Sequence, residues 1–160
     1  GALGDLPAYV PVATGGPDAV LSTAPTAVAP DVGTTGVLLY AEVFPLLLFE
    51  ATGREQALVI HVANEGLVLV TGCGHPGLTN LVIRAQALYQ EPVVGVVGGL
   101  HYGDAKAEDV ADPIAFLQSR GVRLVAMSPH DSGPEVLGAF EAAFADRYHT
   151  LRVGETVRFP

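Results

Sequence analysis

Three histidines of this chain stand in glycine- or proline-marked turns, each just after a run rich in β-branched residues. They are His75 after residues 67–71, His101 after residues 93–97, and His130 after residues 124–127. Three converging imidazoles can hold a metal ion and leave a fourth position open, the arrangement with which zinc activates a water near neutral pH. The sequence therefore indicates a metal site built from His75, His101 and His130.

The spacing of the three histidines predicts how they could converge. Each is separated from the next by about one strand–helix–strand repeat. Right-handed crossovers return the chain to the same edge of a parallel sheet, and ligands bind beyond the carboxyl ends of such strands. We therefore expect all three rings at one sheet edge.

Two aspartates lie just beyond two of these histidines. Asp131 follows His130 directly, and Asp104 stands three residues after His101. Each is either a general base or a partner that orients an imidazole, or else a solvated turn residue. We take His101 and Asp131 as the catalytic candidates.

The remaining ligand-type residues have simpler interpretations. Cys73 could bind a metal as a thiolate, but we expect it to fill space as a small buried apolar residue. His61 lies within an expected strand and His149 at a helix–strand junction. We expect both to be hydrogen-bonded structural residues.

The composition limits the class of protein. The 160 residues are 49% hydrophobic and 16% charged, with a net charge of −9, which argues against binding to a nucleic-acid backbone. No apolar run is long enough to span a membrane, and no secretory signal is visible at the start. The single cysteine excludes an internal disulfide and is typical of a reducing compartment, so we expect a cytoplasmic protein.

The pattern of apolar residues predicts the elements that position the histidines. Residues 1–36 contain five prolines and favour irregular structure with one or two short strands, and Pro45 makes a central strand within residues 37–50 improbable. From there on we expect a hairpin of residues 57–63 and 66–71, helices over 77–90, 106–119 and 135–145, strands over 93–97 and 123–127, and a strand pair within 149–159. This order indicates an α/β fold with parallel strands.

One turn also fits a different function. Residues 72–77 satisfy the pattern G-x-G-x-x-G between a strand and a helix, as in dinucleotide-binding proteins. Pro76 has no N–H to offer a pyrophosphate, and the next strand ends in Val97-Gly-Gly-Leu rather than in an acidic residue that could bind a ribose. A nucleotide-binding α/β module therefore remains an alternative.

At these turns the chain resembles the metallo-β-lactamase superfamily, in particular the branch similar to dihydropterin-ribofuranosylaminobenzene-phosphate synthase. Gly72-Cys-Gly-His-Pro-Gly77 matches the branch's Gly-Cys-Ser-His-x-Gly, with Gly74 in place of serine. Gly98-Gly-Leu-His101 matches Gly-Gly-x-His, and Ser128-Pro-His-Asp-Ser-Gly133 is a looser form of Pro-x-His-Cys-Thr-Gly. Glu55-Gln-Ala-Leu is also similar, as is the segment around His149. The resemblance covers about residues 24–160.

The resemblance implies an αββα sandwich with one or two Zn²⁺ ions at a sheet edge, Mn²⁺ or Fe²⁺ being possible. It implies a hydrolase in which metal-bound hydroxide attacks an ester or phosphoester of a small molecule. The family's first motif, His-x-His-x-Asp-His, does not occur in this sequence. We therefore expect residues 1–160 to form a single domain that is the C-terminal part of the fold. The alternative to an enzyme is a catalytically incomplete fragment or subunit that pairs with an N-terminal partner chain or with a second copy.

Overall fold

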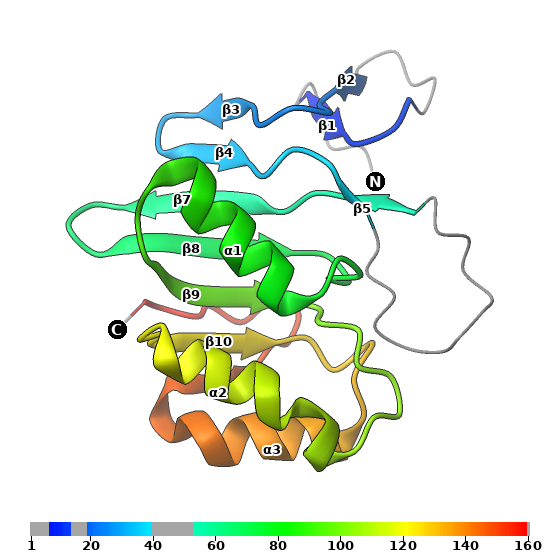
Figure 1. The fold of residues 1–160 in the computed structure, drawn as a ribbon, viewed down its shortest axis with the longest axis vertical. Coiled ribbons are helices and arrows are strands. Elements are labelled where there is room, and N and C mark those ends of the chain that lie inside the picture. Colours follow the sequence, from blue (N-terminus) through cyan, green and yellow to red (C-terminus); the bar gives the residue numbers. More distant parts are fainter. Residues whose placement is uncertain (1–6, 14–18, 40–52, 160) are drawn as a thin grey trace.

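The computed structural model describes residues 7–13, 19–39 and 53–159. Its centre is a seven-stranded mixed sheet with the strand order β11-β10-β9-β8-β7-β4-β3 (Figure 1). Strands β8 to β11 run parallel to one another, whereas β7, β4 and β3 are joined in antiparallel pairs. The strands of this sheet are β3 (Ala27–Ala29), β4 (Val32–Thr34), β7 (Leu58–Val62), β8 (Gly66–Thr71), β9 (Val93–Gly98), β10 (Leu124–Met127) and β11 (Tyr148–Thr150).

Two further pairs of short strands lie outside the main sheet. Strands β1 (Ala8–Val10) and β2 (Ala19–Leu21) pair in parallel, and β5 (Leu38–Leu39) pairs antiparallel with β6 (Arg54–Glu55). Strand β6 leads directly into β7, so the residues of β6 lie next to the edge at which β8 ends.

Three α-helices pack against the sheet and share one hydrophobic core with it. They are α1 (Leu78–Tyr89), α2 (Ala111–Ser119) and α3 (Pro134–Phe144), with the 3-10 turns η1 (Ala107–Val110) and η2 (Ala145–Arg147) beside α2 and α3. The apolar stripe of α1 is buried, as its helical spacing requires. The largest buried side chains are Phe140 and Phe144 of α3, both 0% exposed. Each helix follows one parallel strand and returns the chain to the next, so the parallel strands end at a common edge.

The α/β class and the strand–helix–strand order predicted from the sequence are confirmed. The hairpin of β7 and β8 turns at Ala63, Asn64 and Glu65, where Asn64 has a φ of 65°. The predicted helix over 106–119 divides into η1 and α2, because Pro113 and the preceding acidic turn allow a tighter first turn.

Two expectations about the chain's ends were wrong. Residues 1–36 contain the four strands β1 to β4 rather than one or two. The tail contains β11 alone and no strand pair among residues 149–159, because Leu151 N–H makes the last sheet-type bond, to the Met127 carbonyl, and a turn at Arg152 and Glu155 follows. The prediction about Pro45 lies outside the described residues. Among the described helices, none is both long and apolar enough to cross a membrane.

Candidate metal centre

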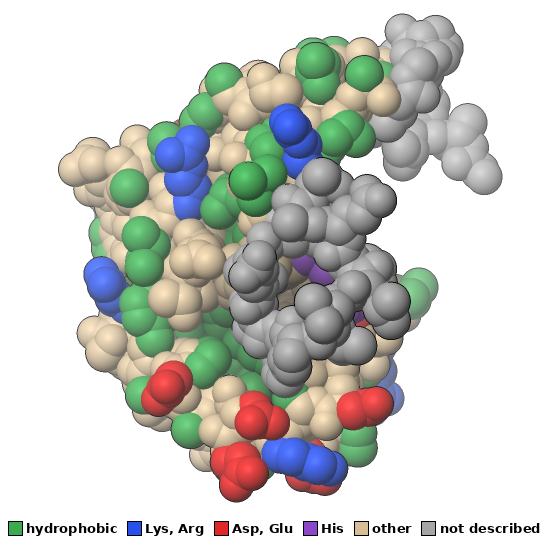
Figure 2. Space-filling view, turned by 45° about the vertical axis from the view of Figure 1, so that its right-hand side comes forward, with side chains coloured by type: hydrophobic (Ala, Val, Ile, Leu, Met, Phe, Trp, Pro, Cys, Tyr) green, Lys and Arg blue, Asp and Glu red, His purple; other side chains and the backbone are tan. Residues whose placement is uncertain are grey.

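The three histidine-bearing turns meet at one edge of the sheet, beyond the carboxyl ends of β8, β9 and β10 (Figure 1). Main-chain hydrogen bonds tie the turns together. Gly99 N–H donates to the Gly72 carbonyl at 2.8 Å, and Gly103 N–H donates to the Asp131 carbonyl at 2.9 Å. Figure 2 turns this edge toward the viewer and shows histidine surface on it, with acidic side chains gathered toward the helical end of the molecule.

Glycine makes the close approach of these turns possible. A Cβ atom on Gly99 would overlap the Gly72 carbonyl and the Asp131 carboxylate. Gly74 has a φ of 74°, and its Cα packs against the Gly99 main chain. Both glycines are therefore required by the contact between the turns.

The potential ligand atoms form two groups that share one residue. Cys73, His75 and His101 bring one ligand atom each within 4.8 Å of one another, and so do Cys73, His130 and Asp131. The structure thus gathers all four predicted site residues at one edge. It does not place the three histidines in a single group among the residues it describes: His75 and His101 are in one group and His130 is in the other.

Cys73 has a different position from the one we expected. Rather than filling the core, the half-buried thiol lies between the two groups, with its Sγ 3.7 Å from His130 Nε2. Burial raises the pKa of the Cys73 thiol, and the nearby carboxylates of Asp131 and Glu55 raise it further. Without a cation nearby, the thiol therefore keeps its proton at neutral pH.

Asp131 is buried and lacks a donor on one oxygen. Its side chain is 4% exposed, and its Oδ2 lies 3.4 Å from His130 Nε2 without forming a hydrogen bond. On the other side of the imidazole ring, His130 Nδ1 lies 2.7 Å from the Ser128 hydroxyl. A buried carboxylate oxygen without a donor costs free energy unless a cation or a donor compensates it.

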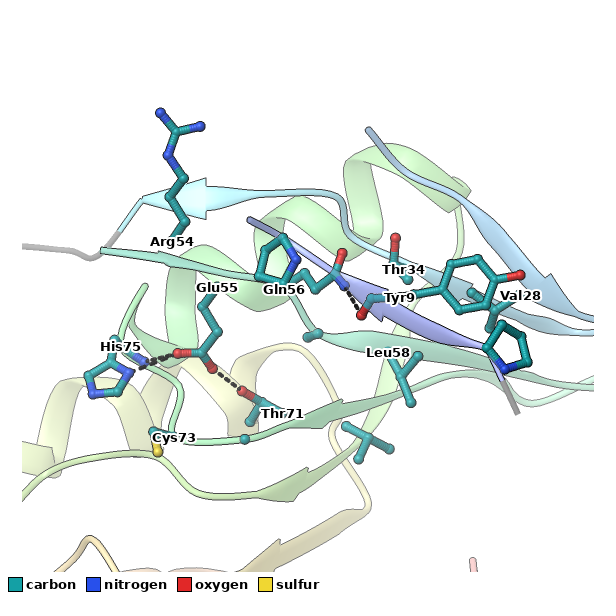
Figure 3. Close-up of a pocket in the computed structure, with 15 residues that line it drawn as sticks. Tyr9, Val28, Thr34, Arg54, Glu55, Gln56, Leu58, Thr71, Cys73 and His75 are labelled. Carbon is teal, nitrogen blue, oxygen red and sulfur yellow. Dashed lines mark hydrogen bonds and ion pairs between the residues drawn. The ribbon is translucent and has the colours of Figure 1, made fainter. Parts of the chain in front are cut away.

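His75 is held by a residue that the sequence did not identify as part of the site. Glu55, from β6, accepts a bond from His75 Nδ1 at 2.9 Å (Figure 3) and from the main-chain N–H groups of Gly74 at 2.8 Å and His75 at 3.2 Å. Its Oε1 also accepts from the Thr71 hydroxyl at 3.0 Å. Since a carboxylate only accepts, the proton lies on Nδ1 and the lone pair of the ring is on Nε2. In the sequence, Glu55 could have been identified as a site residue only from its place in the segment that resembles the family.

His101 is one of two exposed residues of the site, the other being His130. Its ring lies 4.3 Å from that of His75, centroid to centroid, and its main chain adopts a left-handed φ of 48°. Such a conformation is uncommon for a non-glycine residue, although histidine is among the types that adopt it more readily. His101 is therefore near the metal candidates and open to an incoming molecule.

The other sequence candidates lie elsewhere. Asp104 is exposed and belongs to neither ligand group. His61 has its Nε2 2.9 Å from the Glu91 carboxylate and its Nδ1 3.7 Å from that of Asp31, and His149 lies in β11. Both histidines lie in strands of the sheet and belong to neither ligand group.

The turn at residues 72–77 offers little to a nucleotide phosphate. The N–H groups of Gly74 and His75 already donate to the Glu55 carboxylate, and Gly77 N–H donates to the Gly74 carbonyl. Pro76 has no N–H. A negative carboxylate thus occupies the place a pyrophosphate would take, and the nucleotide-binding alternative loses its physical basis.

A groove of about 790 Å³ opens beside the site (Figure 3). Apolar side chains from β1, β3, β7 and β8 form most of its wall, and Arg54, Glu55, Cys73 and His75 line the end near the ligand groups. The groove is large enough for a small organic molecule.

Comparisons with known proteins agree with the resemblance seen in the sequence. Over 99 residues the chain is 29% identical to the 7,8-dihydropterin-6-methyl-4-(β-D-ribofuranosyl)-aminobenzene-5'-phosphate synthase of Methanocaldococcus jannaschii, a match that covers 61% of this chain and 33% of the synthase. A crystal structure of a metal-dependent hydrolase of the β-lactamase superfamily matches with a TM-score of 0.68 at 21% identity, covering 88% of this chain and 57% of that one. No family model matches the chain.

These findings establish the fold. Over most of its length the chain shares the fold of part of a solved metal-dependent hydrolase of the β-lactamase superfamily, in line with the resemblance seen in the sequence. It spans a third of the curated synthase and little more than half of the solved hydrolase.

The residues at the sheet edge fit a divalent metal ion. They supply imidazole nitrogens, a thiol sulfur and carboxylate oxygens, which is a donor set suited to zinc and similar ions. The Asp131 oxygen without a donor is a further fit, because a cation would compensate it. The outer partners of His75 and His130, Glu55 and Ser128, orient the rings as partners of metal ligands do.

Proposed function

We propose that the sheet edge of this chain forms the active site of a metal-dependent hydrolase that cleaves an ester or phosphoester of a small molecule. The observation that carries the proposal is the pair of ligand groups joined at Cys73, beyond the ends of three parallel strands. A bound divalent ion supplies Lewis-acid activation of a water and of the scissile group at such a site. Zinc is the ion we propose, with manganese and iron as the alternatives.

The chain's own residues have distinct parts in this proposal. His75 and His130, one from each ligand group, would hold metal through Nε2, since their Nδ1 atoms face Glu55 and Ser128. Asp131 is a carboxylate beside His130. His101 is either the third nitrogen ligand or, because it is exposed, the group that exchanges a proton with the substrate.

The groove supports a substrate with an apolar body and a negative group. Its wall is mainly apolar, and Arg54, which precedes Glu55 in β6, lines it with a guanidinium that points away from Glu55 and His75 (Figure 3). An arginine is suited to a phosphate or carboxylate. The synthase to which the chain is similar has a ribofuranosyl-aminobenzene phosphate in its name, which agrees with a phosphorylated aromatic compound as the substrate class. A reducing compartment, which we take to be the cytoplasm, would keep the single thiol available.

The test is a metal titration of the chelator-treated chain with Zn²⁺ by calorimetry, followed by an assay on nitrophenyl esters and phosphoesters. We expect His75→Ala and His130→Ala to bind zinc more than about tenfold more weakly than the native chain, since even partners of ligands contribute that much. His61→Ala, which removes an imidazole remote from the site, is the matched control. His101→Ala separates the two proposed roles of His101. If His101 is a metal ligand, the variant loses metal affinity. If it transfers a proton, the variant keeps the metal and loses activity. Equal zinc affinity in all four variants would contradict the proposal.

Partial exposure of apolar residues favours a second candidate, a subunit that pairs with an N-terminal partner chain or with a second copy. Leu58 is 41% exposed on β7 at the groove, and Leu39 and Leu21 are 58% and 56% exposed. Sedimentation of the chain over a range of concentrations tests this candidate. A single monomeric species at all concentrations, unchanged by Leu58→Ser, would exclude pairing of the chain with itself.

A further inference from the structure

Cys73 is the one residue that belongs to both ligand groups. It stands between Gly72 and Gly74 in the turn after β8, two residues before His75, and its thiol reaches toward His130 from the turn after β10. The sequence contains no other cysteine. Any thiolate–metal interaction of this chain must therefore come from Cys73.

The separations around His130 match those between ligands of one ion. With a zinc–sulfur bond of about 2.3 Å and a zinc–nitrogen bond of about 2.05 Å at a tetrahedral angle, the two ligand atoms lie about 3.6 Å apart. The observed distance from Cys73 Sγ to His130 Nε2 is 3.7 Å. A nitrogen and a carboxylate oxygen on the same ion lie about 3.4 Å apart, and His130 Nε2 and Asp131 Oδ2 are separated by 3.4 Å.

Asp131 provides an independent indication of a cation at this place. Its side chain is more than nine-tenths buried, and its Oδ2 has no hydrogen-bond partner. That oxygen lies in the same group as the thiol and the imidazole. A buried carboxylate oxygen that has no hydrogen-bond partner and lies beside two ligand-type atoms fits a coordinating carboxylate.

We infer that Cys73 and Asp131 coordinate the same metal ion as His130, giving a sulfur–nitrogen–oxygen ligand set. The inference rests on the proposed function and makes it more specific. On binding, the sulfur–hydrogen bond breaks, the electron pair stays on sulfur as a ligand to the ion, and the proton passes to solvent. Asp131 is then a ligand rather than a general base.

A thiolate ligand determines which ions the site prefers. Soft sulfur favours Zn²⁺ and Co²⁺ over Mn²⁺ and Mg²⁺, which prefer oxygen. A second consequence follows from the position of Cys73 in both groups. If a second ion occupies the group of His75 and His101, the same sulfur is within reach of it, so the two sites would not be filled independently.

The test uses Co²⁺ as the probe, because a thiolate on cobalt gives a sulfur-to-metal charge-transfer band in the near ultraviolet. The chelator-treated chain is titrated under reducing conditions, alongside Cys73→Ser and Asp131→Asn. Asp104→Asn, which changes an exposed aspartate outside both groups, is the control. Circular dichroism establishes that each variant is folded, and thiol labelling of the native chain with and without Zn²⁺ gives a second readout.

We expect the charge-transfer band in the native chain and in Asp104→Asn, and none in Cys73→Ser. Cobalt affinity should fall more than about tenfold in Asp131→Asn, a loss at least as large as for partners of ligands, and Zn²⁺ should protect Cys73 from labelling. Cobalt binding without the band, and with full labelling of the thiol, overturns the inference and leaves the proposed function standing. Absence of cobalt and zinc binding in the native chain refutes both.

Discussion

Replacement of Glu55 tests whether a carboxylate outside the ligand groups sets the geometry of the metal centre. Its side chain is 14% exposed and accepts bonds from His75 Nδ1, two main-chain N–H groups and the Thr71 hydroxyl. Glu55→Ala leaves all these donors without their acceptor. Each unsatisfied buried donor costs about 1–3 kcal/mol, and water can reach part of this turn, so we expect a loss of about 3 kcal/mol in the free energy of unfolding.

Glu55→Gln keeps the shape of the side chain but replaces one hydrogen-bond-accepting oxygen with a donor, and so tests which of the two properties the site needs. The amide oxygen can still accept from Gly74 N–H and the Thr71 hydroxyl, but the amide nitrogen is a donor and faces the donors of His75. We expect about half the loss of stability seen in Glu55→Ala, at about 1–2 kcal/mol. The His75 ring then loses the partner that fixes its tautomer, and zinc affinity should fall by about 10–100-fold in both variants.

The matched control is Glu91→Gln, which alters another carboxylate paired with a histidine. Glu91 lies 2.9 Å from His61 Nε2, but both side chains are 39% exposed and distant from the site in the fold. An exposed pair of this kind contributes about 0–1 kcal/mol, and zinc affinity should not change. Urea unfolding of the metal-free chains and calorimetric zinc titration give the two quantities. If Glu55→Ala and Glu91→Gln have the same stability and the same zinc affinity, the assigned role of Glu55 is wrong.

Three further predictions concern packing and pH. Gly99→Ala should lower stability by about 1–3 kcal/mol and weaken zinc binding, because the added methyl overlaps the Asp131 carboxylate. Thermal melts test this. The control is Gly138→Ala, whose new methyl meets nothing within 4 Å and whose higher helix propensity should stabilise α3. Phe140→Ala removes a fully buried ring and should cost about 3–5 kcal/mol in urea unfolding, whereas loss of less than about 1 kcal/mol would mean that the core is not packed as described. Burial raises the pKa of Tyr102 far above its usual value, so the unfolded chain ionises first and stability should fall as pH rises above about 10. Tyr102→Phe should reduce that fall in urea midpoints measured between about pH 9 and about pH 11, and an identical slope in both proteins would contradict the assignment.

The half of the fold that follows residue 57 could be predicted because its signals are local. Strands β8, β9 and β10 are short runs buried on both faces, and the helices between them carry apolar stripes at helical spacing. The N-terminal strands could not be predicted, since β1 to β4 have three residues each, too few to show a periodicity. The prediction of a strand pair in the C-terminal tail was wrong for a related reason. An alternating segment forms a strand only where a neighbouring strand is available to pair with it. There the ladder with β10 ends at Leu151.

The residues of the candidate site likewise differ in whether nearby sequence patterns could predict them. Convergence of the histidine turns followed from parallel strands that end together, so His75, His101, His130 and Asp131 could be predicted to share an edge. Glu55 could not, because it reaches His75 from a two-residue strand twenty positions earlier, and no periodicity indicates that contact.

Cys73 shows most clearly what spacing alone leaves undecided. The sequence places it two residues before His75, which is compatible with a buried side chain as well as with a ligand. Its neighbour Gly74 lets the turn approach Gly99 closely, and that approach brings the thiol to His130, 57 positions away in the chain. The role of the cysteine therefore depends on glycines in two different turns. For that reason Gly99→Ala should weaken the sulfur-to-cobalt band along with the stability, although it changes neither the cysteine nor any other ligand.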